Sequence, residues 1–235
     1  MRLDALVGEY QLPEAALPAL SAILALQATD PTASTTVRDP HRAVDRHVAD
    51  SLSALVLGGV RGARRIADLG SGAGWPGLAL AAALPHAHVS LVESAIRHCR
   101  YLERAVGAAG LANVAVIHAR AEEWPDGSEA HDLVTARALA ALPVLCEYAA
   151  PLLGEGGSLV AWKGAVEAAE LADGHAAARL VGLEPAPPRR VVPYAGARDH
   201  ALHAFRKVAP TPARFPRRAG MATKRPLSAT TSSRP

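Results

Sequence analysis

The feature that most constrains the fold of this chain is a glycine-rich stretch that directly follows a short apolar run. An acid stands near the end of the run, three glycines then alternate, and an Ala/Leu-rich segment follows, in the order Ile66-Ala67-Asp68-Leu69-Gly70-Ser71-Gly72-Ala73-Gly74-Trp75-Pro76-Gly77. Glycines let a backbone turn sharply and approach a ligand closely, and the start of the next helix offers free N–H groups. This strand–loop–helix unit predicts a nucleotide-like ligand above the strand ends of an α/β sheet.

The sequence from Arg65 onward has the pattern of a parallel sheet. Short β-forming runs alternate with Ala/Leu-rich segments, which is typical of a sheet covered by helices on both faces. We expect strands at 65–69, 88–93, 114–118, 132–136, 157–162, 189–193 and 200–208. Helices are expected near 77–84, 95–109, 141–153 and 165–180, with a Pro-rich turn at 185–188. The prediction is an α/β fold with a seven-stranded, mostly parallel sheet.

Two further regions flank this sheet. Apolar residues at helical spacing predict helices at 13–27 and 40–57, so that residues 1–60 form an N-terminal helical subdomain ahead of a ligand-binding domain at 61–209. The net charge of +3 is unevenly distributed, because eight basic residues and no acid follow Asp199. Residues 210–235 lack periodicity and predict a basic, extended C-terminal tail, part of it disordered.

Composition excludes several classes of protein. The two cysteines, Cys99 and Cys146, have no metal or redox spacing, and histidine pairs such as His86 and His88 lack matching Cys or carboxylate partners, so no metal site is expected. No signal peptide is apparent, and no run reaches the ~18 apolar residues of a membrane span. We therefore expect a cytoplasmic, monomeric protein without membrane contact.

The glycine loop also fits a dinucleotide pattern, since Gly72-x-Gly74-x-x-Gly77 satisfies G-x-G-x-x-G. Such a match alone is weak evidence. Gly70 directly follows the strand, and Trp75-Pro76 would crowd a pyrophosphate, so a ligand without pyrophosphate is favoured. Glu93 ends the next strand 23 residues after Gly70 and is expected to accept the two hydroxyls of a ribose. Capping of the helix that follows Ser94 is the alternative role for Glu93.

The order hydrophobic-Asp-hydrophobic-Gly-x-Gly-x-Gly resembles the first motif of S-adenosylmethionine-dependent methyltransferases. Residues 33–164 as a whole resemble one family, the bacterial small-subunit (16S) ribosomal RNA guanine-N7 methyltransferases. The matching motifs are Thr35-x-Val37-Arg38-Asp39, Arg46-His47-x-x-Asp50-Ser51, Asp68 to Gly77, Val92-Glu93-Ser94, Arg120-Ala-Glu-Glu-Trp124, Thr135-Ala-Arg137-Ala138 and Trp162-Lys163-Gly164. Ala33-Ser34-Thr35 departs from the Asn-Leu-Thr usual in the family, and Trp75 replaces a smaller apolar residue or Phe.

The resemblance implies a Rossmann-like class I methyltransferase fold and S-adenosyl-L-methionine as the cofactor. Contacts with the cofactor are implied for Gly70, Trp75, Ala121, Glu122 and Arg137, and Asp68, Gly72, Gly74 and Glu93 complete the expected cofactor-binding set. Arg137 is the catalytic candidate, holding the cofactor carboxylate and sensing the base, with a solvated Arg at a strand end as the alternative. His47 and Asp50 suit either helix packing or an RNA contact.

The expected partner is small-subunit ribosomal RNA or a 30S particle. Candidate RNA-binding residues are Lys163, Arg198, Arg214, Arg217, Arg218 and Lys224. The charge of these residues would make RNA binding strongly salt-dependent. A solubilising tail is the alternative for the C-terminal cations, and a surface lysine is the alternative for Lys163. The alternative functions are a non-catalytic RNA-binding assembly factor and an NAD-dependent oxidoreductase.

These expectations yield a first prediction. Deleting residues 210–235 should weaken RNA binding and its salt dependence, while the affinity for S-adenosylmethionine stays nearly unchanged. Binding titrations of both ligands to the truncated chain test it. An equal loss of both affinities would show that the segment belongs to the fold.

Overall fold

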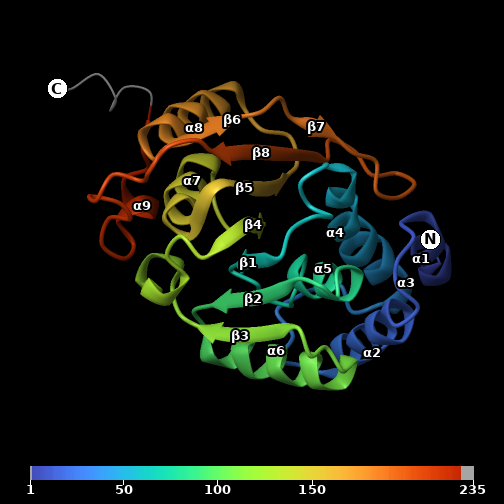
Figure 1. Ribbon diagram of the computed structural model, residues 1–235. Helices are drawn as coiled ribbons and strands as arrows, with labels where there is room; N and C mark the ends of the chain where they lie inside the picture. Colours follow the sequence, from blue (N-terminus) through green and yellow to red (C-terminus); the bar gives the residue numbers. More distant parts are fainter. Residues whose placement is uncertain (1, 229–235) are drawn as a thin grey trace.

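The computed structural model describes residues 2–228 as a central sheet with helices on both faces (Figure 1). Its eight strands are β1 (Arg65–Leu69), β2 (His88–Glu93), β3 (Val114–His118), β4 (His131–Arg137), β5 (Leu153–Lys163), β6 (Leu183–Pro185), β7 (Arg189–Arg190) and β8 (Ala201–Lys207). Seven lie in the order β3-β2-β1-β4-β5-β8-β6, and β7 pairs with β8. Strands β1 to β5 are parallel, whereas β8 runs antiparallel to its neighbours.

Most of the predicted elements are confirmed. Four of the five parallel strands fall where expected, and β5 begins four residues before its predicted start, at the end of the predicted helix 141–153. The helices are α5 (Gly77–Ala83), α6 (Ile96–Ala109), α7 (Leu142–Ala149) and α8 (Ala168–Leu180). The predicted strand at 189–193 shortens to two residues, and β6 was not predicted. Strand β6 has only three residues and ends in a proline, so its sequence carries no β periodicity.

Alternation along the strands divides the core into two layers. Ile66 and Leu91 face one cluster of buried residues, which also contains the N-terminal helices, α5 and α6. Ala67 and Val92 face a second cluster formed by α7, α8 and the C-terminal segment. This period-2 alternation is what a sheet buried on both faces requires. The chain moves from β1 to β3 on one side and returns to β4 on the other, so the strand order reverses between β1 and β4.

The N-terminal helices are α1 (Leu3–Glu9), α2 (Ala16–Thr29) and a continuous helical segment that joins α3 (Pro40–Ala43), the π-helix η1 (Val44–Ala49), α4 (Asp50–Leu52) and the 3₁₀ turn η2 (Ser53–Val56). The carboxylate of Asp39 accepts the N–H of Arg42 and caps the start of α3. Helix α1 was not predicted. These helices share one core cluster with the sheet, so the described residues 2–60 do not have a hydrophobic core of their own.

The C-terminal segment differs from the expected extended tail. Residues 210–228 pack on the face that carries α7 and α8, and Phe215, Ala222 and Leu227 are buried there. A short helix, α9 (Met221–Lys224), lies beside α7 at the left of Figure 1. The apolar anchors are isolated among Pro, Arg and Ser, so no periodicity reveals them. The part of the predicted tail at 229–235 lies outside the described residues.

An ion pair holds this segment to the body. Arg217 donates from Nε and Nη2 to the two carboxylate oxygens of Glu147 at 2.8 and 2.6 Å, and its backbone N–H also reaches Glu147. The Glu147 side chain is only 1% exposed. The guanidinium of Arg217 therefore makes a structural contact, and its role in RNA binding stays a prediction.

Replacing Arg217 tests this contact. In Arg217→Ala the buried Glu147 carboxylate loses its partner, so the free energy of unfolding should fall by about 3 kcal/mol. Urea denaturation measures the change. Arg218→Ala is the matched control, because the Arg218 side chain is exposed and its loss should change stability by under about 0.5 kcal/mol. Equal unfolding midpoints for the two variants would contradict the structural role of Arg217.

Candidate functional site

A cavity of about 360 Å³ opens above the carboxyl ends of β1 to β4, beside the reversal in strand order. Gly70 of the glycine loop and Val92 of β2 lie on its wall, together with Ala121 and Glu122 of the 3₁₀ turn η3 (Ala121–Glu123). Ligands of open α/β sheets bind in this type of crevice. Three of the predicted cofactor-binding residues, Gly70, Ala121 and Glu122, therefore lie where a cofactor would bind.

Gly70 needs the absence of a side chain for two reasons. Its φ is +62°, and a Cβ built there would lie 2.5 Å from Cδ1 of Leu139. The N–H groups of Gly70 and Ser71 donate to the carbonyl oxygen of Val92 at 2.9 and 3.2 Å, which ties the loop to β2. The loop can thus turn beneath the cavity while the side chain of Leu139 packs against Gly70.

The carboxylate of Asp68 stabilises the glycine loop through buried hydrogen bonds. Its side chain is 0% exposed, and its carboxylate accepts the N–H of Gly77 at 3.2 Å and the hydroxyl of Thr135 at 2.8 Å. These bonds connect β1 to β4 and to the start of α5. Burial raises the pKa of Asp68 to about 6. The carboxylate of Asp68 is enclosed by protein and lines neither cavity, and its contact with the cofactor stays a prediction.

Glu93 also binds the backbone. Its two carboxylate oxygens accept the N–H of Gly72 at 3.0 Å and that of Ala95 at 2.8 Å. The capping alternative therefore describes the geometry of Glu93, and its contact with a ribose stays a prediction. Gly74 does not line the cavity either, since a Cβ there would lie 2.2 Å from Cδ1 of Leu78.

Trp75 points toward the N-terminal helices. Its indole N–H donates to Oε1 of Gln27 at 2.7 Å, and its ring stacks on His47 with centroids 5.7 Å apart. The side chain is 4% exposed and does not line the first cavity. The side chain of Trp75 therefore ties the glycine loop to the N-terminal helices, and the contact of Trp75 with the cofactor stays a prediction.

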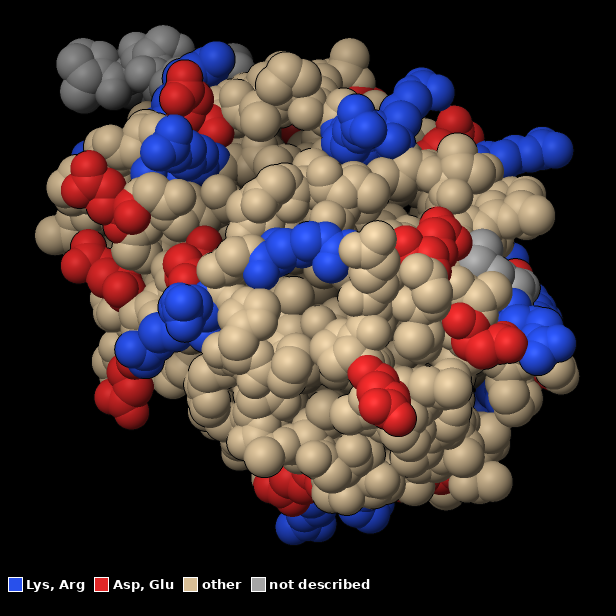
Figure 2. Space-filling model, turned by 45° about the vertical axis from the view of Figure 1, so that its right-hand side comes forward, with Lys and Arg blue, Asp and Glu red and all other residues tan. Residues whose placement is uncertain are grey.

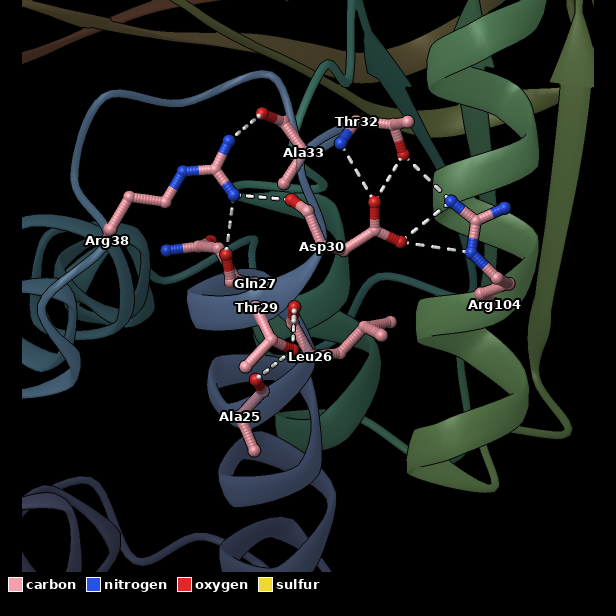
Figure 3. A network of polar contacts seen from close by, with 9 residues as sticks. All are labelled: Ala25, Leu26, Gln27, Thr29, Asp30, Thr32, Ala33, Arg38 and Arg104. Atoms are coloured by element: carbon pink, nitrogen blue, oxygen red, sulfur yellow. Dashed lines mark hydrogen bonds and ion pairs between the residues drawn. The ribbon is translucent and has the colours of Figure 1, made fainter.

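A second polar network holds the loop that precedes α3 (Figure 3). Arg38 donates to the backbone carbonyls of Gln27, Asp30 and Ala33. The carboxylate of Asp30 accepts the hydroxyl and N–H of Thr32 and the guanidinium of Arg104 on α6. Because of these hydrogen bonds, the pKa of Asp30 falls to about 2. Within the motif Thr35-x-Val37-Arg38-Asp39, the side chain of Arg38 therefore stabilises the conformation of this loop.

A second cavity, of about 530 Å³, is lined by charged and aromatic groups, among them Arg46, His47, Asp50, Arg137, Lys163 and His200. Arg137 donates to the carboxylate of Asp50 at 2.9 Å, to the carbonyl of Arg46 at 3.0 Å and to Nδ1 of His47 at 3.1 Å. Its side chain is 15% exposed and lines only this second cavity. The guanidinium is therefore directed away from the cavity in which the cofactor carboxylate was expected.

Three consecutive residues join the two cavities. Arg137 and Ala138 line the second cavity, and Leu139 lines the first. Ala138 has a φ of +54°, a conformation that non-glycine residues rarely adopt. This turn after β4 directs successive side chains to opposite cavities and makes the cavities neighbours.

The protonation state of His47 follows from its contacts. Burial, together with the charge of Arg137, lowers the pKa of His47 to about 3, so the ring is neutral. A guanidinium only donates, so Nδ1 of His47 accepts from Arg137 and Nε2 carries the proton toward Oγ1 of Thr35 at 3.0 Å. Both nitrogens are occupied. The two oxygens of Asp50 are occupied as well, by Arg137 and by Nδ1 of His200 at 3.0 Å.

The remaining RNA-binding candidates divide into two groups. Lys163 pairs with Glu170 at 2.8 Å and donates to the carbonyl of Ala140. The second group has exposed side chains and consists of Arg198, Arg214, Arg218 and Lys224. In the face shown in Figure 2, basic and acidic groups are interspersed among uncharged residues, so that face has no broad basic patch.

Several lining residues were not predicted. Tyr148, Thr223 and Pro226 contribute to the first cavity, and His200 to the second. They come from parts of the chain far from the glycine loop, and no local motif marks them.

Among residues 2–228, no group of three or more His, Cys, Asp or Glu side chains is arranged to hold a metal. No helix within the described part of the chain is long and apolar enough to cross a membrane.

The sheet order, the glycine loop after β1 and the cavity above the strand ends define a Rossmann-like methyltransferase. Solved structures support this fold. The *Methanococcus jannaschii* fibrillarin pre-rRNA processing protein matches with a TM-score of 0.53 at 17% identity, over 68% of this chain and 74% of that chain. The antibiotic-resistance methyltransferase Kmr matches with a TM-score of 0.52 at 21% identity, over 63% and 88%.

Sequence relatives identify the family. The family model described as rRNA small subunit methyltransferase G matches residues 25–187. Proteins with the name ribosomal RNA small subunit methyltransferase G are 38% identical in *Desulfitobacterium hafniense*, over 82% of this chain and 81% of the relative, and 40% identical in *Rubrobacter xylanophilus*, over 81% and 75%. The chain belongs to the rRNA small subunit methyltransferase G family. It is an S-adenosylmethionine-dependent rRNA methyltransferase.

The buried Asp68 predicts a pH dependence of stability. Its pKa rises from 3.8 in the unfolded chain to about 6 in the fold, so its contribution is fully present below pH 3.8 and is lost as the pH rises through about 6. Asp68→Asn removes this titration. Relative to wild type, the variant should gain about 3 kcal/mol between pH 4 and pH 7 in urea denaturation.

Asp126→Asn is the control, because Asp126 is exposed. The difference in unfolding free energy between this control and wild type should stay constant over the same pH range. If Asp68→Asn and wild type show parallel pH profiles, Asp68 does not titrate as described.

Proposed function

We propose that the protein methylates N7 of a guanine in small-subunit ribosomal RNA, with S-adenosylmethionine in the first cavity and the guanine in the second. The observation that carries this proposal is the turn at Arg137, Ala138 and Leu139, which makes the two cavities neighbours. A methyl donor and an acceptor base need this adjacency, because transfer requires the reacting atoms to be about 3–3.5 Å apart.

The polar groups of the second cavity suit an acceptor without a proton. Guanine N7 has an in-plane lone pair and no hydrogen at neutral pH, so it needs no general base. His47 and Asp50, which a base-catalysed reaction would use, have both of their polar atoms occupied. Catalysis by positioning is sufficient, since well-oriented reactions reach effective molarities of roughly 10⁵–10⁸ M.

Asp50 and Arg137 have separate roles in the proposed transfer of the methyl group. Methyl transfer carries positive charge from the sulfonium to the guanine ring, and the Asp50 carboxylate in the cavity wall would stabilise that developing charge. Arg137 contacts the same carboxylate and His47, so it would orient both toward the base. This role replaces the expected grip on the cofactor carboxylate.

The exposed cations provide a surface for RNA phosphates. Arg198, Arg214, Arg218 and Lys224 are exposed, and phosphate contacts from such residues give salt-dependent affinity. Together with the family's ribosomal substrate, this supports small-subunit RNA or a 30S particle as the partner.

Methyl transfer from labelled S-adenosylmethionine to small subunits that lack the modification tests the proposal. N7-methylguanosine, mapped by chemical cleavage of the RNA, should appear with wild type. In Arg137→Ala the rate should fall by about 10²-fold, because Asp50 and His47 lose their orientation.

Arg179→Ala is the matched control, since Arg179 is an exposed arginine on α8. It should retain the wild-type rate. A label at a base amine or a ribose hydroxyl instead of N7, or equal rates for Arg137→Ala and the control, would refute the proposed acceptor or the role of Arg137.

A further inference from the structure

Three parts of the chain that are distant in sequence meet at one end of the first cavity. Glu122 comes from η3, Tyr148 from α7 and Thr223 from α9, and all three line the cavity. The hydroxyl groups of Tyr148 and Thr223 lie 3.2 Å apart. Oε1 of Glu122 accepts the N–H of Gly220, at the start of α9, at 3.0 Å. The C-terminal segment thus forms part of the cavity wall.

This wall is firmly attached. Phe215, Ala222 and Leu227 are buried against the same core cluster as α7, and Arg217 is paired with the buried Glu147. The Glu122 side chain that receives Gly220 is only 3% exposed. Residues before and after Thr223 in the sequence therefore pack against the body of the protein, and they fix the position of Thr223 in the cavity wall.

The position of this cluster indicates which end of the cofactor it faces. The methyl group must point toward the second cavity, which the first cavity adjoins through Leu139. In Figure 1, α9 and α7 lie on the left of the sheet, whereas α4, which carries Asp50 of the second cavity, lies on the right. The portion of S-adenosylmethionine farthest from the acceptor is its adenine.

Adenine presents an exocyclic amino group with two N–H donors, and a pocket that selects it needs oxygen acceptors. The carboxylate of Glu122 and the hydroxyls of Tyr148 and Thr223 supply them. We propose that Tyr148 and Thr223, beside Glu122, bind the amino group of the cofactor adenine, so that the C-terminal segment contributes to the cofactor site. The inference rests on the proposed function, which places the cofactor in this cavity.

Deletion of the C-terminal segment should therefore change cofactor affinity, contrary to the expectation drawn from charge alone. A truncation that removes residues 210–235 would remove Thr223 and one wall of the cofactor cavity, so cofactor affinity should fall together with RNA affinity. The exposed Arg218 and Lys224 lie on the same segment as Thr223. One stretch of chain thus carries a cofactor contact and cations available to RNA phosphates.

A matched pair of ligands separates recognition of the amino group from a general structural effect. Calorimetry on the full-length chain would compare S-adenosylhomocysteine with S-inosylhomocysteine, in which a carbonyl oxygen replaces the adenine amino group. Wild type should bind the adenosyl ligand at least 10-fold more tightly, because the inosyl carbonyl would face the carboxylate of Glu122, which can only accept hydrogen bonds. Thr223→Val and Tyr148→Phe remove one hydroxyl each with little change in shape.

In each variant the dissociation constant of the adenosyl ligand should rise about 3- to 10-fold, while that of the inosyl ligand stays constant or falls. Thr223→Ser keeps the hydroxyl and should restore the wild-type preference. Thr36→Val is the matched control, since Thr36 is exposed and lines neither cavity. It should leave both affinities unchanged.

Two results would overturn the inference while leaving the proposed function intact. One is an equal loss of affinity for both ligands in Thr223→Val and Tyr148→Phe, which indicates packing alone. The other is no change in either variant. If wild type binds neither ligand, the proposed function and this inference fail together.

Discussion

The buried carboxylate of Asp68 connects the elements on which both cavities depend. It accepts hydrogen bonds from Thr135 on β4 and from Gly77 at the start of α5, and it lies where the strand order reverses. Enclosing an acid in this way is unfavourable for its charged form, as its raised pKa shows. The hydrogen bonds nevertheless align the ends of β1 and β4, and the glycine loop and the Arg137 turn extend from those two ends.

Each end of the described chain completes one of the cavities. The helices near the N-terminus bring His47 and Asp50 against Arg137 and thereby form the second cavity. The C-terminal segment brings Thr223 against Tyr148 and closes the first. The sheet and its helices supply the floor that the two cavities share. Removal of either terminal segment would therefore alter a binding site as well as the stability of the fold.

Much of the architecture is predictable because it depends on local patterns. The five parallel strands and their helices follow from apolar periodicity, and Gly70 is recognisable because a loop that turns directly after a strand favours glycine. Strand β6 and the packing of Phe215 are not predictable in this way. Their stabilising contacts come from distant segments, and neither has a periodic pattern around it.

The sequence by itself determined the fold class and the position of the glycine loop, because these depend on residue types at fixed short spacings. It indicated the kind of cofactor through its resemblance to a methyltransferase family. Only the tertiary structure decided which way the side chains point. Asp68, Glu93 and Trp75 belong to the recognised motifs, yet they bind the loop and its neighbours. Thr223 belongs to no motif and lines the first cavity. Burial and hydrogen bonding between distant segments set these directions, and spacing along a chain does not encode them.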